Sequence, residues 1–247
     1  MTTEEIAEAR RRGGLLADAR SVTLEEGYAL AEEVAARLGE VVGWKVGATS
    51  AGAQAFLQVA EPIYGRVFAG GVMASGAVAA PGERAAEAEP EIVFELTRDP
   101  DPADPAAAIG RALVGLEVVR PSRDDAFALG AGFIVADNAA HVGLVLGPEL
   151  PPGALNEPAG LRVALERNGE AAGKGDAAAV LGDPVQALAW LVRKRAGTER
   201  PVRAGDLVAT GAMCRAAPLA IGDRVVADFG RWGRVEAARE VMGRPGE

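Results

Sequence analysis

The sequence predicts a protein of the mixed α and β class, with helices at the front of the chain and strands behind. Apolar residues recur at helical spacing before residue 40, and from Val41 the apolar period changes to two. The 247 residues, 49% of them hydrophobic, are enough to bury a full core. We expect a single unit, in which residues 1–75 form a helical region and first strand and residues 76–247 form a β-rich catalytic core.

The helix expected over "TLEEGYALAEEVAARLGE" has a clear start and stop. Thr23 and Glu26 have the spacing of a capping box, in which each side chain bonds the other residue's backbone. Gly39 is a typical stop, and the apolar residues of 31–38 form one stripe that we expect to pack on the rest of the protein.

The first strand is expected in "VVGWKVGATS", residues 41–50. Val42, Trp44 and Val46 point to one side of such a strand, and Lys45 points to the other. The residues two before and two after Lys45 on its side are glycines, which leave space around the ammonium group.

An acidic pair precedes the apolar run of "EAEPEIVFEL", residues 87–96. On a strand, Glu89 and Glu91 share one face, while the apolar residues that follow occupy the other. On an open surface water would screen the two charges, whereas in a cleft they would raise each other's pKa unless a cation neutralised them. Pro90 lacks a backbone donor, so we expect it at a strand start or edge.

The remaining segments continue the β-rich pattern. Residues 110–123 form another strand candidate, which carries Glu117. A hairpin is expected to turn at Asn168-Gly169, and a helix follows Asp183, which has proline at the next position. Residues 205–238 alternate short strands with Gly-Asp turns.

Composition excludes several classes of function. The formal charge of -9 disfavours nucleic-acid and anionic-membrane partners, and the single cysteine, Cys214, excludes an internal disulfide. With only His141, multi-histidine zinc sites are excluded, so a bound metal would be held by oxygen. A nucleophile-histidine triad would have to use His141. Because no basic and apolar leader begins the sequence, we expect a cytoplasmic protein.

Six motifs in order resemble the hydratase and decarboxylase branch of the fumarylacetoacetate hydrolase superfamily, typified by 2-oxopent-4-enoate hydratase and 2-oxo-3-hexenedioate decarboxylase. They are "GWKVGATS", "EPEIVF", "GLEVV", "ADNAA", "LGDPVQALAWL" and "GDLVATGAM". The resemblance implies an α+β fold, a fumarylacetoacetase C-terminal-like mixed β-roll with an N-terminal helical region. It also implies Mg2+ or Mn2+ held by Glu89, Glu91 and Glu117, with Lys45 facing the substrate, and a homo-oligomer, in some cases associated with a related pathway enzyme.

The hypothesis for function is a metal-dependent lyase that acts on a small 2-oxo acid or 2-hydroxydienoate through an enolate. The first interpretation is a hydratase, which adds water to a 2-hydroxypenta-2,4-dienoate-like substrate. The alternatives are a 2-oxo-3-hexenedioate-type decarboxylase, a tautomerase, a C–C hydrolase and a non-catalytic partner that retains the fold.

The sequence departs from the family pattern near the expected catalytic residues. Hydratases commonly have an aspartate at the position of Ile63, so a carboxylate for proton transfer is missing there. His141 replaces a small residue and is a candidate acid or base, although a lone histidine at a strand start is more often structural. Asp137 and Asn138 are candidates for substrate contacts or support of the site, the alternative being an ordinary turn.

Overall fold

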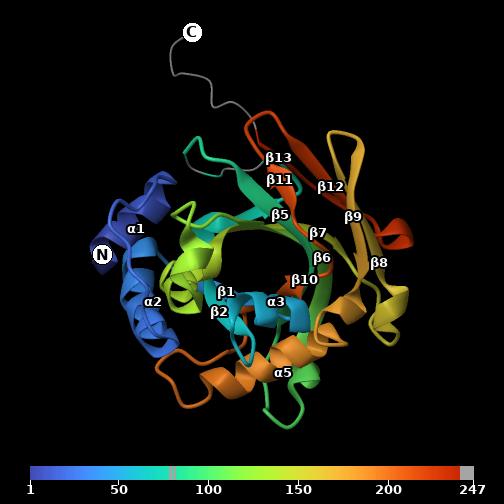
Figure 1. Cartoon of the computed structure of the whole chain (residues 1–247). Helices are drawn as coiled ribbons and strands as arrows, with labels where there is room; N and C mark the ends of the chain where they lie inside the picture. The colour runs from blue at the N-terminus through green and yellow to red at the C-terminus, as the bar shows by residue number, and fades with distance from the viewer. Residues whose placement is uncertain (78–79, 81, 240–247) are drawn as a thin grey trace.

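The computed structural model describes residues 1–77, 80 and 82–239, and it has the α+β fold expected from the sequence (Figure 1). The larger of its two sheets curls into a roll with strand order β2-β1-β10-β5-β6-β7-β3, and β11 pairs with β5 beside β10. The second sheet has the order β4-β13-β12-β8-β9. Within the described residues, no helix combines the length and apolar character needed to cross a membrane.

The helices are α1 (Thr3–Arg12), α2 (Leu24–Leu38), α3 (Ala51–Leu57), α4 (Ala131–Ala136) and α5 (Pro184–Arg195). The strands of the roll are β1 (Val41–Gly47), β2 (Ile63–Phe68), β3 (Val72–Ala74), β5 (Ala86–Leu96), β6 (Ile109–Val119), β7 (His141–Glu149), β10 (Leu207–Ala212) and β11 (Ala217–Leu219). Those of the second sheet are β4 (Gly76–Ala77), β8 (Arg162–Arg167), β9 (Glu170–Asp176), β12 (Arg224–Asp228) and β13 (Arg234–Ala238).

Several local predictions are confirmed. The capping box of Thr23 and Glu26 starts α2, the β8–β9 hairpin turns at Asn168-Gly169, and the Asp183 side chain caps α5. Helix α1 lies in the region expected to be helical and has its own capping box, formed by Thr2 and Glu5. No individual helix was predicted at the short α3 or α4.

Three apolar clusters hold these elements together. The largest fills the space between the two sheets and α5, with Trp44, Phe94, Leu116 and Leu188 among its fully buried side chains. A second joins α1, α2 and α4. The third is small and lies on the inner face of the roll, where it contains Val67, Val93, Leu144 and Ala209.

Pro90 departs from its expected place. It lies in the middle of β5, a central strand, rather than at a start or edge. The carbonyl of Pro90 accepts a bond from Met213 N at 2.9 Å, and in an antiparallel strand the N and O of one residue point the same way. The missing N–H of Pro90 therefore faces the gap between the end of β10 and the start of β11. No regular hydrogen bond between strands is lost there.

Glycines allow α2 and α4 to pack in direct backbone contact. A Cβ placed on Gly27 would lie 2.2 Å from the carbonyl oxygen of Gly132, which is too close for any side chain. A Cβ on Gly132 would in turn lie 2.1 Å from the carbonyl oxygen of Val22. This contact fixes α4 and hence the turn that follows it, which reaches the candidate site described below.

We expect Gly27→Ala to lower the free energy of unfolding by about 2–3 kcal/mol, because the methyl group would push the two helix backbones apart. Gly52→Ala in α3 is the matched control, since no atom lies within 4 Å of its added Cβ and alanine favours a helix by about 0.5–1 kcal/mol. Urea unfolding measures both variants. Equal stability of the two would show that the close helix contact is unimportant.

Candidate metal centre

Strands β5 and β6 bring three glutamates into one small volume. Glu89 pairs directly with Glu117 across the two strands, and Glu91 lies two residues further along β5 on the same face. Carboxylate oxygens of the three residues lie within 4.8 Å of one another. The face shared by Glu89 and Glu91, predicted from their spacing, is therefore present, and it is the inner face of the roll.

The carboxylates of Glu91 and Glu117 are buried and only partly satisfied, whereas Glu89 is partly exposed. Glu91 Oε2 accepts a hydrogen bond from Gly211 N at 2.9 Å, Glu91 Oε1 has no hydrogen-bond partner among the described residues, and Glu117 Oε2 has only its ion pair with Lys45. Buried polar atoms are normally paired, and an unpaired one costs roughly 1–3 kcal/mol. Oxygen-only donors with open valences fit a hard divalent cation such as Mg2+ or Mn2+.

Lys45 lies beside these carboxylates. Its Nζ is 3.2 Å from Glu117 Oε2 and donates a hydrogen bond of 3.2 Å to the carbonyl oxygen of Ala139. The side chain is 6% exposed, so the ion pair lies away from solvent. A Cβ at Gly47 would make an ordinary contact, 3.4 Å from both Lys45 Nζ and a carbon of Ile63, whereas a Cβ at Gly43 would lie 2.1 Å from the carbonyl oxygen of Leu207. Gly43 therefore allows β1 and β10 to approach closely and does not make space for the ammonium group.

Ile63 lies on the same side of the sheet as Lys45. It pairs with Gly47 across β1 and β2, is 2% exposed, and joins the apolar cluster of α1, α2 and α4. The wall beside the ammonium group is therefore apolar at this position.

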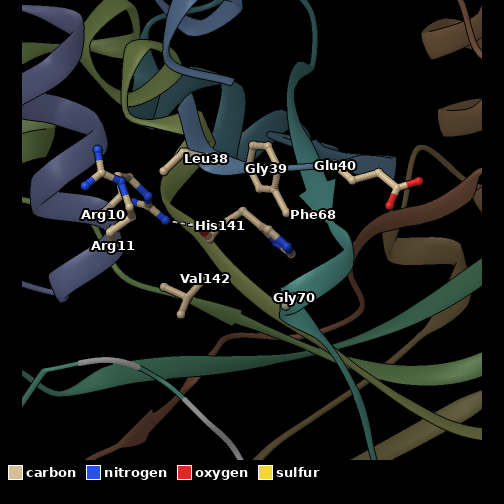
Figure 2. Close-up of a pocket in the computed structure, with 10 residues that line it drawn as sticks. Arg10, Arg11, Leu38, Gly39, Glu40, Phe68, Gly70, His141 and Val142 are labelled. Atoms are coloured by element: carbon tan, nitrogen blue, oxygen red, sulfur yellow. Dashed lines mark hydrogen bonds between the residues drawn. The ribbon is translucent and has the colours of Figure 1, made fainter. Parts of the chain in front are cut away.

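His141 contacts Glu117 from the opposite side. Its Nδ1 lies 2.7 Å from Glu117 Oε1, and its Nε2 is buried without a hydrogen-bond partner in the described part of the chain. The residue also lines a cavity of about 270 Å³ beside α1 and β2 (Figure 2). Figure 2 shows the imidazole ring extending away from Arg10, which contacts the His141 backbone.

Asp137 and Asn138 make backbone contacts with their side chains. Asn138 Oδ1 accepts from Arg66 N at 2.8 Å, and Asn138 Nδ2 donates to Arg66 O at 2.9 Å. Asp137 Oδ2 accepts from Ser122 N at 2.6 Å, and Asp137 Oδ1 forms an ion pair of 3.2 Å with Arg10. Neither side chain has a bond to Lys45 or to the three glutamates.

The turn after α4, η4 (Asn138–Ala140), presents the carbonyl group that Lys45 uses. Asn138, Ala139 and Ala140 all have positive φ, between 49° and 62°, which is unfavourable for residues with a side chain. Gly65 allows the turn to approach, because a Cβ there would lie 2.6 Å from Asn138 O. Sequence reasoning missed this use of a backbone carbonyl, and likewise the Gly211 amide, since neither carries a side-chain signal.

Charges at the site shift one another strongly in the metal-free protein. Burial and the nearby Glu117 raise the pKa of Glu89 to about 7, and burial with Glu117 and Glu89 raises the pKa of Glu91 well above its ordinary value. Burial also acts to raise the pKa of Glu117, but Lys45 and His141 outweigh it and the pKa is lowered. Burial opposes the charge on Lys45, yet the three carboxylates raise its pKa. Burial lowers the pKa of His141. Lys45 and Glu117 are therefore an ion pair, and Glu89 and Glu91 lack a counter-charge.

Comparison with known proteins identifies the family. Residues 26–238 match the family described as fumarylacetoacetate (FAA) hydrolase C-terminal. The chain belongs to this family. It is 34% identical to the TodF product hydratase of Pseudomonas putida, over 94% of this chain and 91% of the relative. It is 32% identical to the 4-oxalocrotonate decarboxylase of a Pseudomonas species, over 78% of this chain and 75% of that one.

Solved structures agree with this assignment. The 4-oxalocrotonate decarboxylase of Pseudomonas putida, complexed with magnesium and adipate, superimposes with a TM-score of 0.84 at 25% identity, covering 97% of this chain and 95% of that chain. A fumarylpyruvate hydrolase of Pseudomonas aeruginosa, in complex with Mn2+ and pyruvate, has a TM-score of 0.59 at 18% identity, covering 81% and 89%, and so shares the fold. Both of those proteins were solved with a divalent cation.

Cation binding by this chain is expected to weaken as the pH falls below about 7, because the cation competes with protons for Glu89. For each proton that the cation must displace, its apparent affinity falls up to about tenfold for every pH unit below the pKa. Calorimetric titration of Mn2+ between pH 5.5 and 8 measures this. An affinity that is constant over this range would contradict the shifted pKa.

A rise in pH has the opposite consequence for the stability of the metal-free protein: it strengthens cation binding but weakens folding. Because the pKa of Glu89 is higher in the folded than in the unfolded protein, its contribution to stability is present at low pH and is lost as the pH rises through about 7. Glu89→Gln, which mimics the protonated group, is the control. Between pH 6 and 8 in the presence of a chelator, its free energy of unfolding should fall less than that of the wild type, as measured by urea unfolding.

Proposed function

We propose that this protein is a divalent-metal-dependent hydratase that adds water to a 2-hydroxydienoate with one carboxylate, such as 2-hydroxypenta-2,4-dienoate. The observation that carries the proposal is the cluster of Glu89, Glu91 and Glu117 beside the ammonium group of Lys45. The hydratase relatives that match most of the chain support the same reaction class.

We assign the three glutamates as ligands of Mg2+ or Mn2+. Their oxygens are the donors that these ions prefer, and the buried Glu91 Oε1 has no hydrogen-bond partner among the described residues. When bound, the cation would supply Lewis-acid stabilisation of negative charge on the 2-oxo oxygen of the substrate. Gly211 N and His141 Nδ1 each hold one oxygen of a ligand and so orient the other oxygen.

Lys45 is the residue that acts on the substrate. Its ammonium group lies beside the three carboxylates and can pair with the carboxylate or enolate oxygen of a 2-oxo acid. In hydration, the 2-hydroxydienoate loses its hydroxyl proton and gains a proton at carbon 5; the hydroxyl group of water then adds to carbon 4 of the conjugated ketone, and the resulting enolate gains a proton at carbon 3. The ammonium group of Lys45, held by Ala139 O, is placed to balance the charge that develops on oxygen.

Charge balance favours a substrate with a single carboxylate. The charges of a divalent cation and of Lys45 together equal those of the three ionised glutamates. The loaded site would then be neutral before substrate binds, and each carboxylate of the substrate would add one negative charge. Among the described residues, Lys45 is the one lysine or arginine in contact with these carboxylates. Further along the inner face, the wall consists of Val67, Val93, Leu144 and Ala209. Beyond these residues the same face carries Arg111, which pairs with Glu95 and Glu149, so a second carboxylate would compete with two glutamates for that cation.

The decarboxylase remains the second candidate because one specific observation favours it. The 4-oxalocrotonate decarboxylase structure that superimposes over 97% of this chain was solved with adipate, a dicarboxylate. A dicarboxylate in this chain would require a cationic side chain for its far end. Release of CO2 from 2-oxo-3-hexenedioate distinguishes this reaction from hydration.

His141, Asp137 and Asn138 serve in this proposal to position other groups. His141 fixes the carboxylate of Glu117, while Asn138 and Asp137 hold the turn whose carbonyl group binds Lys45. Nδ1 of His141 bonds Glu117, so a base role in C–C hydrolysis would fall to Nε2, which has no partner in the described part of the chain.

We expect the purified protein to consume 2-hydroxypenta-2,4-dienoate in the presence of Mg2+ or Mn2+, followed as decay of its ultraviolet band. Glu91→Gln should lower kcat/KM about 100-fold or more, because a neutral amide replaces a metal ligand. Glu95→Gln is the matched control, since Glu95 lies further along the same strand but pairs with exposed Arg111. Rapid CO2 release from 2-oxo-3-hexenedioate without hydration would replace the proposal by the decarboxylase.

Lys45→Met should separate substrate chemistry from cation binding. The variant removes the positive charge that competes with the metal for Glu117, so the Mn2+ affinity should be unchanged or higher. The same variant should lower kcat about 100-fold or more, because the substrate loses its charged partner. Calorimetry and turnover measure the two effects, and retained turnover would exclude Lys45 from the reaction.

A further inference from the structure

Arg10, on α1, is almost fully buried although the helix lies at the edge of the molecule (Figure 1). Its Nη1 donates to Arg120 O at 3.1 Å and to Asp137 Oδ1 at 3.2 Å, and its Nη2 donates to His141 O. One planar guanidinium group thus holds three acceptors from different segments of the chain. Figure 2 shows the bond to His141 from the side of the neighbouring cavity.

The acceptors lie where the β6–β7 ladder ends. Val119 pairs with His141 after a register shift, and beyond it Arg120 N donates to Ala140 O at 2.8 Å. The two strands carry Glu117 and His141, whose 2.7 Å contact needs both strands in register. Strand register is least well defined at an irregular end of a sheet. The bonds from Arg10 to both segments at this point therefore help to fix the register of β6 and β7.

Asp137 makes the tie stronger than a neutral contact would be. Its carboxylate is fully buried, and Arg10 is its ion-pair partner among the described residues. Removing one partner of a buried ion pair is strongly destabilising, because the other charge stays buried. Asp137 also starts the left-handed turn whose Ala139 carbonyl binds Lys45, so the same guanidinium supports both neighbours of Glu117.

We propose that Arg10 is a positioning residue for the candidate metal centre: by joining the end of β6, Asp137 and the start of β7, it holds His141 against Glu117. Its effect on the cation rests on the proposed function, whereas its effect on the His141–Glu117 contact does not. Helix α1 is therefore a support of the site as well as part of the apolar packing.

The single histidine of the chain gives a direct readout of this role. A buried imidazole Nδ1–H in a 2.7 Å bond to a carboxylate should give one downfield proton signal by nuclear magnetic resonance. We expect Arg10→Met to broaden or abolish this signal in the metal-free protein and to weaken Mn2+ binding roughly 10–100-fold. Arg10→Lys keeps a charge for Asp137 but cannot reach three acceptors, so its effects should be smaller.

Arg11→Met is the matched control. This neighbouring arginine is 43% exposed, and its ion pairs are with Glu4 and Glu8 of the same helix, so both measurements should match the wild type. If the Arg10→Met protein does not fold, the Arg10→Lys protein decides the question. An unchanged histidine signal in a folded Arg10 variant would overturn the proposal, whereas loss of Mn2+ binding by the wild type would overturn the proposed function alone.

Discussion

The rest of the structure depends on holding three carboxylates together in a buried space with one ammonium group. Each uncompensated buried ion costs several kcal/mol, so the arrangement persists only if stronger constraints fix it. The constraint on Glu89 and Glu117 is the backbone ladder itself, because they are directly paired residues of adjacent strands. The constraint on Lys45 is its parallel pairing with β10, which places it on the same inner face. Regular sheet bonds thereby offset the repulsion that a divalent cation would relieve.

The second constraint is the left-handed turn of Asn138, Ala139 and Ala140. Each positive φ at a residue with a Cβ costs of order 1 kcal/mol, and strain of this kind persists only where surrounding contacts over-determine the conformation. Here Asn138 binds both backbone groups of Arg66, and Asp137 is bound by Arg10 and by the Ser122 amide. The turn in return delivers a carbonyl group to Lys45 and starts β7 with His141 facing Glu117. Contacts from other segments thus hold a strained turn beside the cluster of glutamates.

Most of what lies on one regular element was predictable from the sequence, and what depends on contacts between elements was not. The shared face of Glu89 and Glu91 follows from strand periodicity alone, and that of Lys45 follows in the same way. Helical spacing places Arg10 on the apolar face of Ile6 and Ala7, but the three acceptors that it binds come from distant segments and have no sequence signal. The predicted position of Pro90 was wrong, because the gap between β10 and β11 that accommodates it depends on contacts between elements. The backbone donors and acceptors of the site likewise have no sequence signature.

The inventory of titratable groups narrows the chemistry further. Carboxylates that bind a cation cannot also serve as acids, which removes Glu89, Glu91 and Glu117 from proton transfer in the loaded site. Nδ1 of His141 is engaged by Glu117, and Ile63 puts an apolar wall where a further carboxylate would be useful. Among the described residues around the cluster, proton movement therefore falls to Lys45, to Nε2 of His141 or to water. Such a site suits an enolate reaction, in which the cation and the ammonium group would share the charge that develops on oxygen.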